Sequence, residues 1–113
     1  MSNIIISVAK QYSVAPAGRY VVDGPYSGER FREEFLYPAI TGLEAGTKVE
    51  VDLDGTLGYG SSFLDEAFGG LLREHSITLS EIRSKLTVIS TRPMYEKKIW
   101  QYITDAAMSS PRA

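Results

Sequence analysis

The spacing of apolar and polar positions changes between residues 49 and 73, and this stretch organises the rest of the chain. Apolar and polar residues alternate from Val49 to Leu53, and a period of two predicts a half-buried strand. From Phe63 onward the apolar residues recur every three or four positions, which predicts a helix with one buried face. We therefore expect a strand, a glycine-rich loop that carries Ser61 and Ser62, and then a helix.

Three other segments have the composition of strands. Residues 3–8, 19–22 and 85–89 are rich in β-branched and apolar side chains, which favour extended structure. The second of these segments is expected to form a wide hairpin with the first. The order of elements along the chain is then β-β-α-β-α-β-α. This order predicts an α/β domain with a mixed four-stranded sheet covered by about three main helices.

Serine and threonine residues mark the expected starts of the other helices. Ser27 is a favoured N-cap residue, and the helix after it should kink or end near Tyr37, because Pro38 cannot donate a backbone hydrogen bond. Ser80 is expected to begin a single helical turn. Ser90 or Thr91 is expected to cap the final helix, whose first turn tolerates a proline.

Composition and charge narrow the possible functions. The 113 residues include no cysteine and one histidine, so neither cysteine chemistry nor a histidine cluster for zinc is expected. The net charge of −2 gives no basic surface for nucleic acid. The apolar run Ile4–Ile6 is too short for a signal peptide or a membrane span, so we expect a cytoplasmic protein without membrane contact. One domain is expected over residues 1–113, frayed at 1–2 and 109–113.

A first motif lies where the strand at 49–53 ends. The residues DLDGTL at 52–57 resemble the first motif of haloacid-dehalogenase-type phosphohydrolases. The resemblance implies a magnesium-dependent hydrolase in which Asp52 is the nucleophile and Asp54 the general acid. In that family, however, the motif opens the fold, whereas two predicted strands and a helix precede it here. A strand that ends in a turn rich in Asp and Gly explains the same residues.

A second resemblance covers most of the chain, from about residue 18 to residue 107. The residues SGERFREEFL at 27–36, the strand at 49–52 and the residues GSSFLDEAFGGL at 60–71 resemble the STAS-like domain family of unknown function. This family is similar to the STAS domains of bacterial anti-sigma factor antagonists. In those antagonists a serine at the start of a helix is phosphorylated by a partner that is both an ATPase-fold kinase and an anti-sigma factor.

Aligned on the strand, the resemblance places the regulatory serine at Ser61, with Gly60 in place of an aspartate and Phe63 in place of a glycine. It implies a non-catalytic signalling module without a cofactor, which binds a histidine-kinase-type ATPase or an anti-sigma-like kinase. Asp65 and Glu66 make this helix end acidic, so a partner surface with Arg or Lys is expected. The candidate residues are Ser61 and Ser62 as phospho-acceptors, together with Tyr59, Gly60, Asp65 and Glu66 as further partner contacts.

Each of these residues also has a purely structural interpretation. Ser62 suits the N-cap of the second helix, with Asp65 in the role of the capping-box glutamate. Tyr59 suits core packing as well as it suits an interface. Gly69 and Gly70 weaken a helix by about 1 kcal/mol each relative to alanine, and close packing of that helix on the sheet is the simplest reason for them. At the level of sequence both interpretations of the serines stay open.

Overall fold

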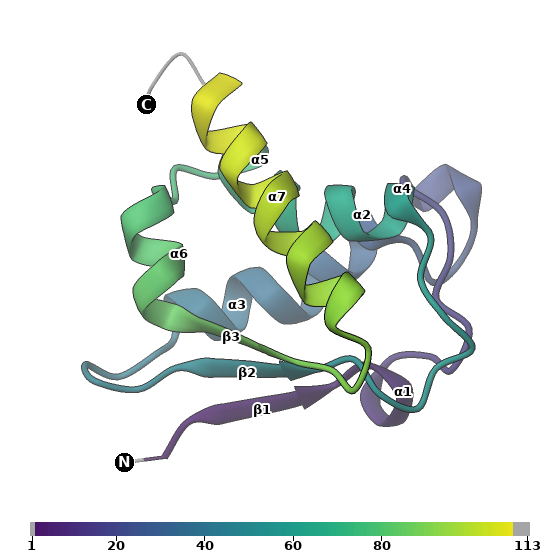
Figure 1. Ribbon diagram of the computed structural model, residues 1–113, viewed down its shortest axis with the longest axis horizontal. Coiled ribbons are helices and arrows are strands. Elements are labelled where there is room, and N and C mark those ends of the chain that lie inside the picture. Colours follow the sequence, from purple (N-terminus) through teal and green to yellow (C-terminus); the bar gives the residue numbers. More distant parts are fainter. Residues whose placement is uncertain (1, 110–113) are drawn as a thin grey trace.

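The computed structural model describes residues 2–109 and forms a small α/β domain (Figure 1). Residues 1 and 110–113, most of the ends predicted to fray, lie outside the described residues, whereas Ser109 ends the last helix. The strands are β1 (Ile4–Ser7), β2 (Val49–Asp52) and β3 (Leu86–Ile89). The helical elements are α1 (Val8–Gln11), η1 (Val21–Asp23), α2 (Gly28–Phe31), η2 (Arg32–Leu36), α3 (Tyr37–Thr41), α4 (Ser61–Leu64), η3 (Asp65–Gly69), α5 (Gly70–Glu74), α6 (Leu79–Lys85) and α7 (Pro93–Ser109).

Within residues 2–109 the sheet has three strands, all parallel, in the order β1–β2–β3. Ile4 lies opposite Val49, which in turn lies opposite Leu86. The predicted mixed sheet of four strands under about three helices is therefore wrong. This part of the chain forms three parallel strands and, when contiguous helical elements are counted together and the 3₁₀ turn η1 is left out, five helices, which keeps it in the α/β class. Parallel neighbours need crossover connections, and both connections here contain helices.

The segment predicted to be the second strand forms the 3₁₀ turn η1 instead. Its backbone donors are taken by nearby carboxylates. The Tyr20 N–H donates to Asp23 Oδ2 at 2.8 Å. The Val21 N–H donates to Glu29 Oε1 at 2.9 Å. Val22 is 89% exposed, so no buried face would stabilise an extended pairing. Local side-chain hydrogen bonds thus outweigh the β-branched composition.

Two helical runs, residues 28–41 and 61–74, each contain a π-helical turn, η2 and η3. The sequence predicts that the first helix kinks or ends near Tyr37, but the run continues to residue 41. In η2 the Tyr37 N–H bonds to the carbonyl of Arg32, five residues back. The hydrogen-bond register has therefore already shifted where the proline enters the helix.

Helix caps follow the sequence in one case and depart from it in another. Ser27 caps the first run as predicted, because its hydroxyl accepts a hydrogen bond from the Arg30 N–H at 3.1 Å. The turn expected to begin at Ser80 is the helix α6, and Thr78 caps it. Glu81 completes a capping box with Thr78, so the stronger pair of capping groups sets the start.

One face of the sheet is buried against the helices. In β2, Val49 and Val51 are fully buried, whereas the polar residues between and after them are partly exposed. The same cluster of buried side chains includes three phenylalanines from the two helical runs, Phe31, Phe63 and Phe68. In Figure 1 the strands run across the lower part of the view, and α2, α4, α5 and α7 lie above them.

All three strands end on the same side of the molecule, to the right in Figure 1, because they are parallel. The loops that follow the strands meet there. The Leu53 N–H donates to the carbonyl of Ile89 at 2.9 Å, and the Leu57 N–H donates to the carbonyl of Val14 at 2.8 Å. Parallel sheets commonly bind ligands at this edge.

Among the described helices, none has both the length and the apolar character that crossing a membrane requires.

Candidate functional site

Ser61 and Ser62 are the first two residues of α4, and both are exposed. The N-cap is Gly60, whose backbone is extended (φ −79°, ψ 157°), and no side chain caps the helix. The first backbone hydrogen bond of the helix joins the Leu64 N–H to the carbonyl of Gly60 at 3.2 Å. The prediction that Ser62 is the N-cap is therefore wrong, and neither hydroxyl is used to begin the helix.

Asp65 does not take the capping role either. Its carboxylate binds Arg19 Nη1 at 2.8 Å and Arg73 Nη1 at 3.1 Å. Burial alone would raise the pKa of Asp65, but the hydrogen bonds from Arg19 and Arg73 outweigh burial and lower this pKa below its ordinary value of 3.8. The side chain is therefore charged and already paired at neutral pH.

Glu66 points into the protein and is 5% exposed. Its Oε2 accepts a hydrogen bond from Arg32 Nη1 at 2.7 Å, and its backbone carbonyl accepts another from the same nitrogen at 2.7 Å. Arg32 is itself 3% exposed, although helical periodicity assigns it to the outer face. One feature of the sequence is connected with this burial, the glycine at position 70. A Cβ on Gly70 would overlap the Arg32 guanidinium. The glycine is needed because an arginine, not the sheet, packs closely against it.

These residues form one group, called the arginine cluster below: Arg19, Arg32, Asp65, Glu66 and Arg73. The cluster joins three segments, because its arginines come from the chain before η1, from η2 and from α5. The two acidic residues predicted to attract a basic partner are thus held by arginines of the same chain. The start of α4 is left with the two serines as its exposed polar side chains.

Tyr59 lies in the loop before α4 and is half-buried. Its hydroxyl donates to the carbonyl of Leu53 at 2.8 Å, and its ring packs against Phe63 and Tyr95 with centroid distances of 5.8 Å and 5.2 Å. Burial raises the pKa of Tyr59 to about 12, so the phenol stays neutral and keeps its proton for this hydrogen bond. The residue fixes the loop to the end of β2.

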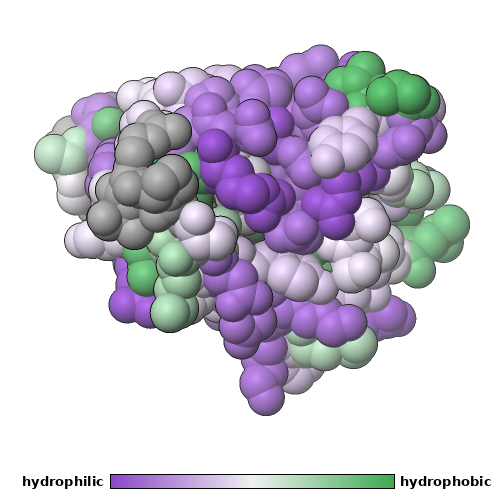
Figure 2. Space-filling view, turned by 90° about the horizontal axis from the view of Figure 1, so that it is seen from above, coloured by the Kyte–Doolittle hydropathy of each residue, from purple (hydrophilic) through white to green (hydrophobic). Residues whose placement is uncertain are grey.

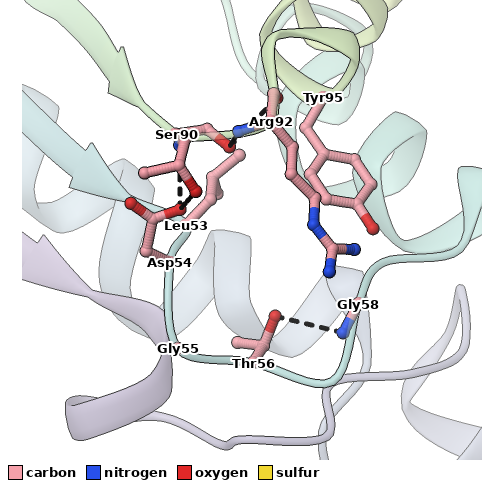
Figure 3. A pocket seen from close by; sticks show the side chains of 9 residues that line it. Leu53, Asp54, Gly55, Thr56, Gly58, Ser90, Arg92 and Tyr95 are labelled. Atoms are coloured by element: carbon pink, nitrogen blue, oxygen red, sulfur yellow. Dashed lines mark hydrogen bonds between the residues drawn. The ribbon is translucent and has the colours of Figure 1, made fainter.

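A cleft of about 140 Å³ lies between the loops that follow β2 and β3 (Figure 3). Asp54 Oδ1 accepts hydrogen bonds from the N–H and the hydroxyl of Thr91, at 2.9 and 3.0 Å, and so joins the two loops. Ser90 Oγ accepts from the Arg92 N–H at 3.0 Å. Ser90 or Thr91 was expected to cap α7, but Ser90 bonds to Arg92 within the loop before this helix, and Thr91 bonds to Asp54 of the loop after β2. The lining residues are Leu53, Asp54, Gly55, Thr56, Gly58, Ser90, Thr91, Arg92 and Tyr95.

The two carboxylates of the phosphohydrolase interpretation do not both line this cleft. Asp54 does, whereas Asp52 is not among the lining residues. Asp52 Oδ1 accepts a hydrogen bond from the Asp54 N–H at 2.9 Å, an arrangement typical of a turn after a strand. Within residues 2–109, no three side chains of His, Cys, Asp or Glu are grouped so that they could hold a metal ion.

Fold and site together define a small α/β domain with two exposed serines at a helix start. A family profile described as a STAS-like domain of unknown function matches residues 27–96, more than half of the chain. The chain therefore belongs to this family, as the sequence resemblance predicts. No curated protein and no solved structure shows a significant match. The matched range contains both serines and all of the arginine cluster except Arg19.

Proposed function

We propose that this STAS-like domain is a non-catalytic regulatory module that binds a protein partner at the start of α4. Phosphorylation of Ser61 or Ser62 controls this binding. One observation carries the proposal: both hydroxyls are exposed in the first turn of the helix, and neither serves as a cap. A hydroxyl that the fold does not use is accessible to a kinase. The family resemblance suggests the partner, a histidine-kinase-type ATPase or an anti-sigma-like kinase.

Exposed apolar side chains in the loop that leads to the serines support docking at this part of the chain. Leu57, four residues before Ser61, is 84% exposed, and Val14, whose carbonyl binds the Leu57 N–H, is 55% exposed. Figure 2 shows a largely hydrophilic upper surface with hydrophobic patches at its right-hand end. Apolar groups in a polar surround are typical of protein contact sites. We call Val14, Leu57, Ser61 and Ser62 the docking surface.

The position of the serines suggests how a phosphate would act. Phosphorylation adds about −1.5 to −2 charges. Ser61 and Ser62 open the helical run 61–74, and the free N–H groups of a first helical turn favour an anion. The fold should therefore tolerate the phosphate, while a docked partner would meet new charge and bulk. Partner binding is expected to change and stability is not.

Mass spectrometry of the protein purified from its native cell tests the modification. We expect a phosphorylated fraction that maps to Ser61 or Ser62 and disappears when both are replaced by alanine. Phosphate found only on other residues would contradict the switch. A protein that binds its partner without any phosphate would favour a plain adaptor instead.

Co-purification tests the position of the docking surface. Ser62→Asp is expected to reduce the amount of the ATPase-type partner recovered with the domain, because it adds charge at the proposed contact. Ser80→Asp is the matched control, since Ser80 is the exposed second residue of α6 just as Ser62 is the exposed second residue of α4. Equal losses from both variants would argue against docking at α4.

The phosphohydrolase alternative has a separate test. Hydrolysis of p-nitrophenyl phosphate with magnesium is measured for the wild type and for Asp52→Asn. We expect no difference, because Asp52 lies outside the cleft and Asp54 is bonded to Thr91. Turnover by the wild type that the variant loses would overturn the non-catalytic proposal.

A further inference from the structure

The cleft between the loops after β2 and β3 has no part in the proposed docking surface. It opens at the carboxyl ends of two parallel strands, the edge at which such sheets commonly bind ligands. Its volume of about 140 Å³ compares with about 30 Å³ for one water in the liquid, so a group the size of phosphate fits.

Arg92 supplies a positive charge to the cleft. Its side chain extends from the start of α7 toward Thr56 and Gly58 on the opposite wall (Figure 3). Within residues 2–109 its guanidinium has neither an ion-pair nor a hydrogen-bond partner. Its backbone, in contrast, is fixed: Ser90 Oγ accepts from the Arg92 N–H and donates to the Arg92 carbonyl, both at 3.0 Å. A guanidinium held in this way presents several donors to one anion.

Two hydroxyls on the walls can donate to the same anion. Thr56 Oγ1 accepts from the Gly58 N–H at 3.3 Å, and the Thr56 side chain is also hydrogen-bonded to that of Tyr59, so an anion would share the hydroxyl proton with Tyr59. The Tyr95 hydroxyl accepts from the Tyr59 N–H at 3.3 Å and keeps its proton. Gly58 leaves room between them, because a Cβ there would lie 3.3 Å from the Tyr95 hydroxyl.

Asp54 is the carboxylate that lines this cleft, and it is hydrogen-bonded to Thr91. Its Oδ1 takes both hydrogen bonds from Thr91, and Figure 3 shows the group on the side of the cleft away from the Arg92 guanidinium. The negative charge of Asp54 lowers the affinity of the cleft for an anion. Its carboxylate accepts hydrogen bonds from Thr91, and not from Arg92, Thr56 or Tyr95. The donors that the cleft offers an anion are therefore the Arg92 guanidinium, the Tyr95 hydroxyl and the Thr56 hydroxyl, of which the last also bonds to Tyr59.

We propose that this cleft binds a phosphate group, either as inorganic phosphate or as the terminal group of a small phosphate monoester. Arg92 pairs with the anion, and Thr56 and Tyr95 donate to its remaining oxygens. No covalent step is involved. The proposal does not rest on the proposed function, since none of these residues belongs to the docking surface.

NMR titration of the isotope-labelled full chain with inorganic phosphate tests this site, at constant ionic strength with chloride as the reference anion. We expect saturable shifts of the amides of Thr56, Gly58 and Arg92. Arg92→Gln should weaken binding by about tenfold or more, and Thr56→Val by about two- to tenfold. The control is Arg83→Gln on α6, an exposed arginine outside the cleft, which should bind phosphate as the wild type does.

Adenosine monophosphate distinguishes the two sources of the phosphate group. If adenosine monophosphate binds more tightly than inorganic phosphate, and Arg92→Gln loses this binding, the cleft is assigned to a monoester. Equal binding of the two assigns it to phosphate alone.

Three outcomes would each overturn the proposal: equal affinity of Arg92→Gln and wild type, equal shifts with chloride, or no saturable shifts at the cleft. Circular dichroism of each variant confirms that it is folded. Failure here leaves the partner-binding tests on Ser62 unaffected.

Discussion

Two arginines show how differently one kind of side chain is used in this domain. Arg32 is 3% exposed and donates to Glu66 at 2.7 Å and to Glu33 at 2.6 Å. Arg92 is exposed, and within the described part of the chain its guanidinium is unpaired. The first arginine joins the two helical runs, whereas the second extends into an open cleft.

Solvent explains the difference. A buried charge must be paired, because removing one partner leaves the other without water or a counter-charge. An exposed charge is solvated and costs the fold little, so it is available for a ligand. Changes in the arginine cluster should therefore alter stability, and changes at the cleft or the docking surface should alter binding. The following predictions test this separation in order of expected size.

The largest effect is expected from the same substitution at the two arginines. Arg32→Gln removes the shortest ion pair of the buried Glu66 and leaves only the longer pairs of its Oε1, to Arg19 at 3.3 Å and to Arg73 at 3.7 Å, so it should lower the free energy of unfolding by about 3 kcal/mol. Arg92→Gln should change it by less than about 0.5 kcal/mol. Urea denaturation followed by circular dichroism measures both. Similar losses at the two positions would remove the distinction between the regions.

A double variant sharpens this result. Arg32→Met combined with Glu66→Leu removes both charges at once, so neither is left unpaired. It should be more stable than Arg32→Gln alone. A double variant that is less stable than the single one would mean that the ion pair itself, and not the unpaired charge, accounts for the loss.

The next effect concerns the packing of the cluster. Gly70→Ala should lower the free energy of unfolding by about 1–2 kcal/mol, because the new Cβ overlaps the Arg32 guanidinium, which two ion pairs hold in place. Gly60→Ser is the control at the other region. A serine at this extended N-cap should stabilise α4 by a few tenths of a kcal/mol. Urea denaturation of the two variants should therefore give shifts of opposite sign.

A smaller effect separates the serines. Ser27 is fully buried and caps the first helical run, so Ser27→Ala should cost about 1 kcal/mol. Ser62→Ala should cost less than about 0.5 kcal/mol, because that hydroxyl caps nothing. Thermal unfolding of both variants provides the comparison. A loss at Ser62 equal to that at Ser27 would restore a structural role for the candidate phospho-acceptor.

The smallest expected effect is on the free energy of unfolding at acidic pH. The pKa of Asp65 is lowered below 3.8 in the folded protein, so its pairs with Arg19 and Arg73 contribute stability above that pH. The contribution is lost as the pH falls through the folded pKa, because the unfolded chain then binds the proton more readily. The free energy of unfolding should therefore fall less steeply between about pH 5 and pH 2 in Asp65→Asn than in the wild type. Parallel curves would contradict this.

Much of the fold follows from local patterns. The apolar alternation at β2 and the β-branched runs at β1 and β3 were sufficient to predict each of the three strands of the described sheet. Ser27 was sufficient to predict the start of the first helix. The segment at η1 could not be predicted in the same way, because the carboxylate of Glu29 that holds its backbone comes from a later element.

The sequence by itself determined the order of elements that form the parallel strands, the family, and a helix that begins beside Ser61 and Ser62. Only the tertiary structure decided that Arg32 is buried, that it forms an ion pair with Glu66, and that neither serine caps the helix. The physical reason is the separation along the chain of the residues that interact. Periodicity reports on neighbours along the chain, whereas an ion pair such as Arg32–Glu66 joins residues that only the packing of two helical runs brings together.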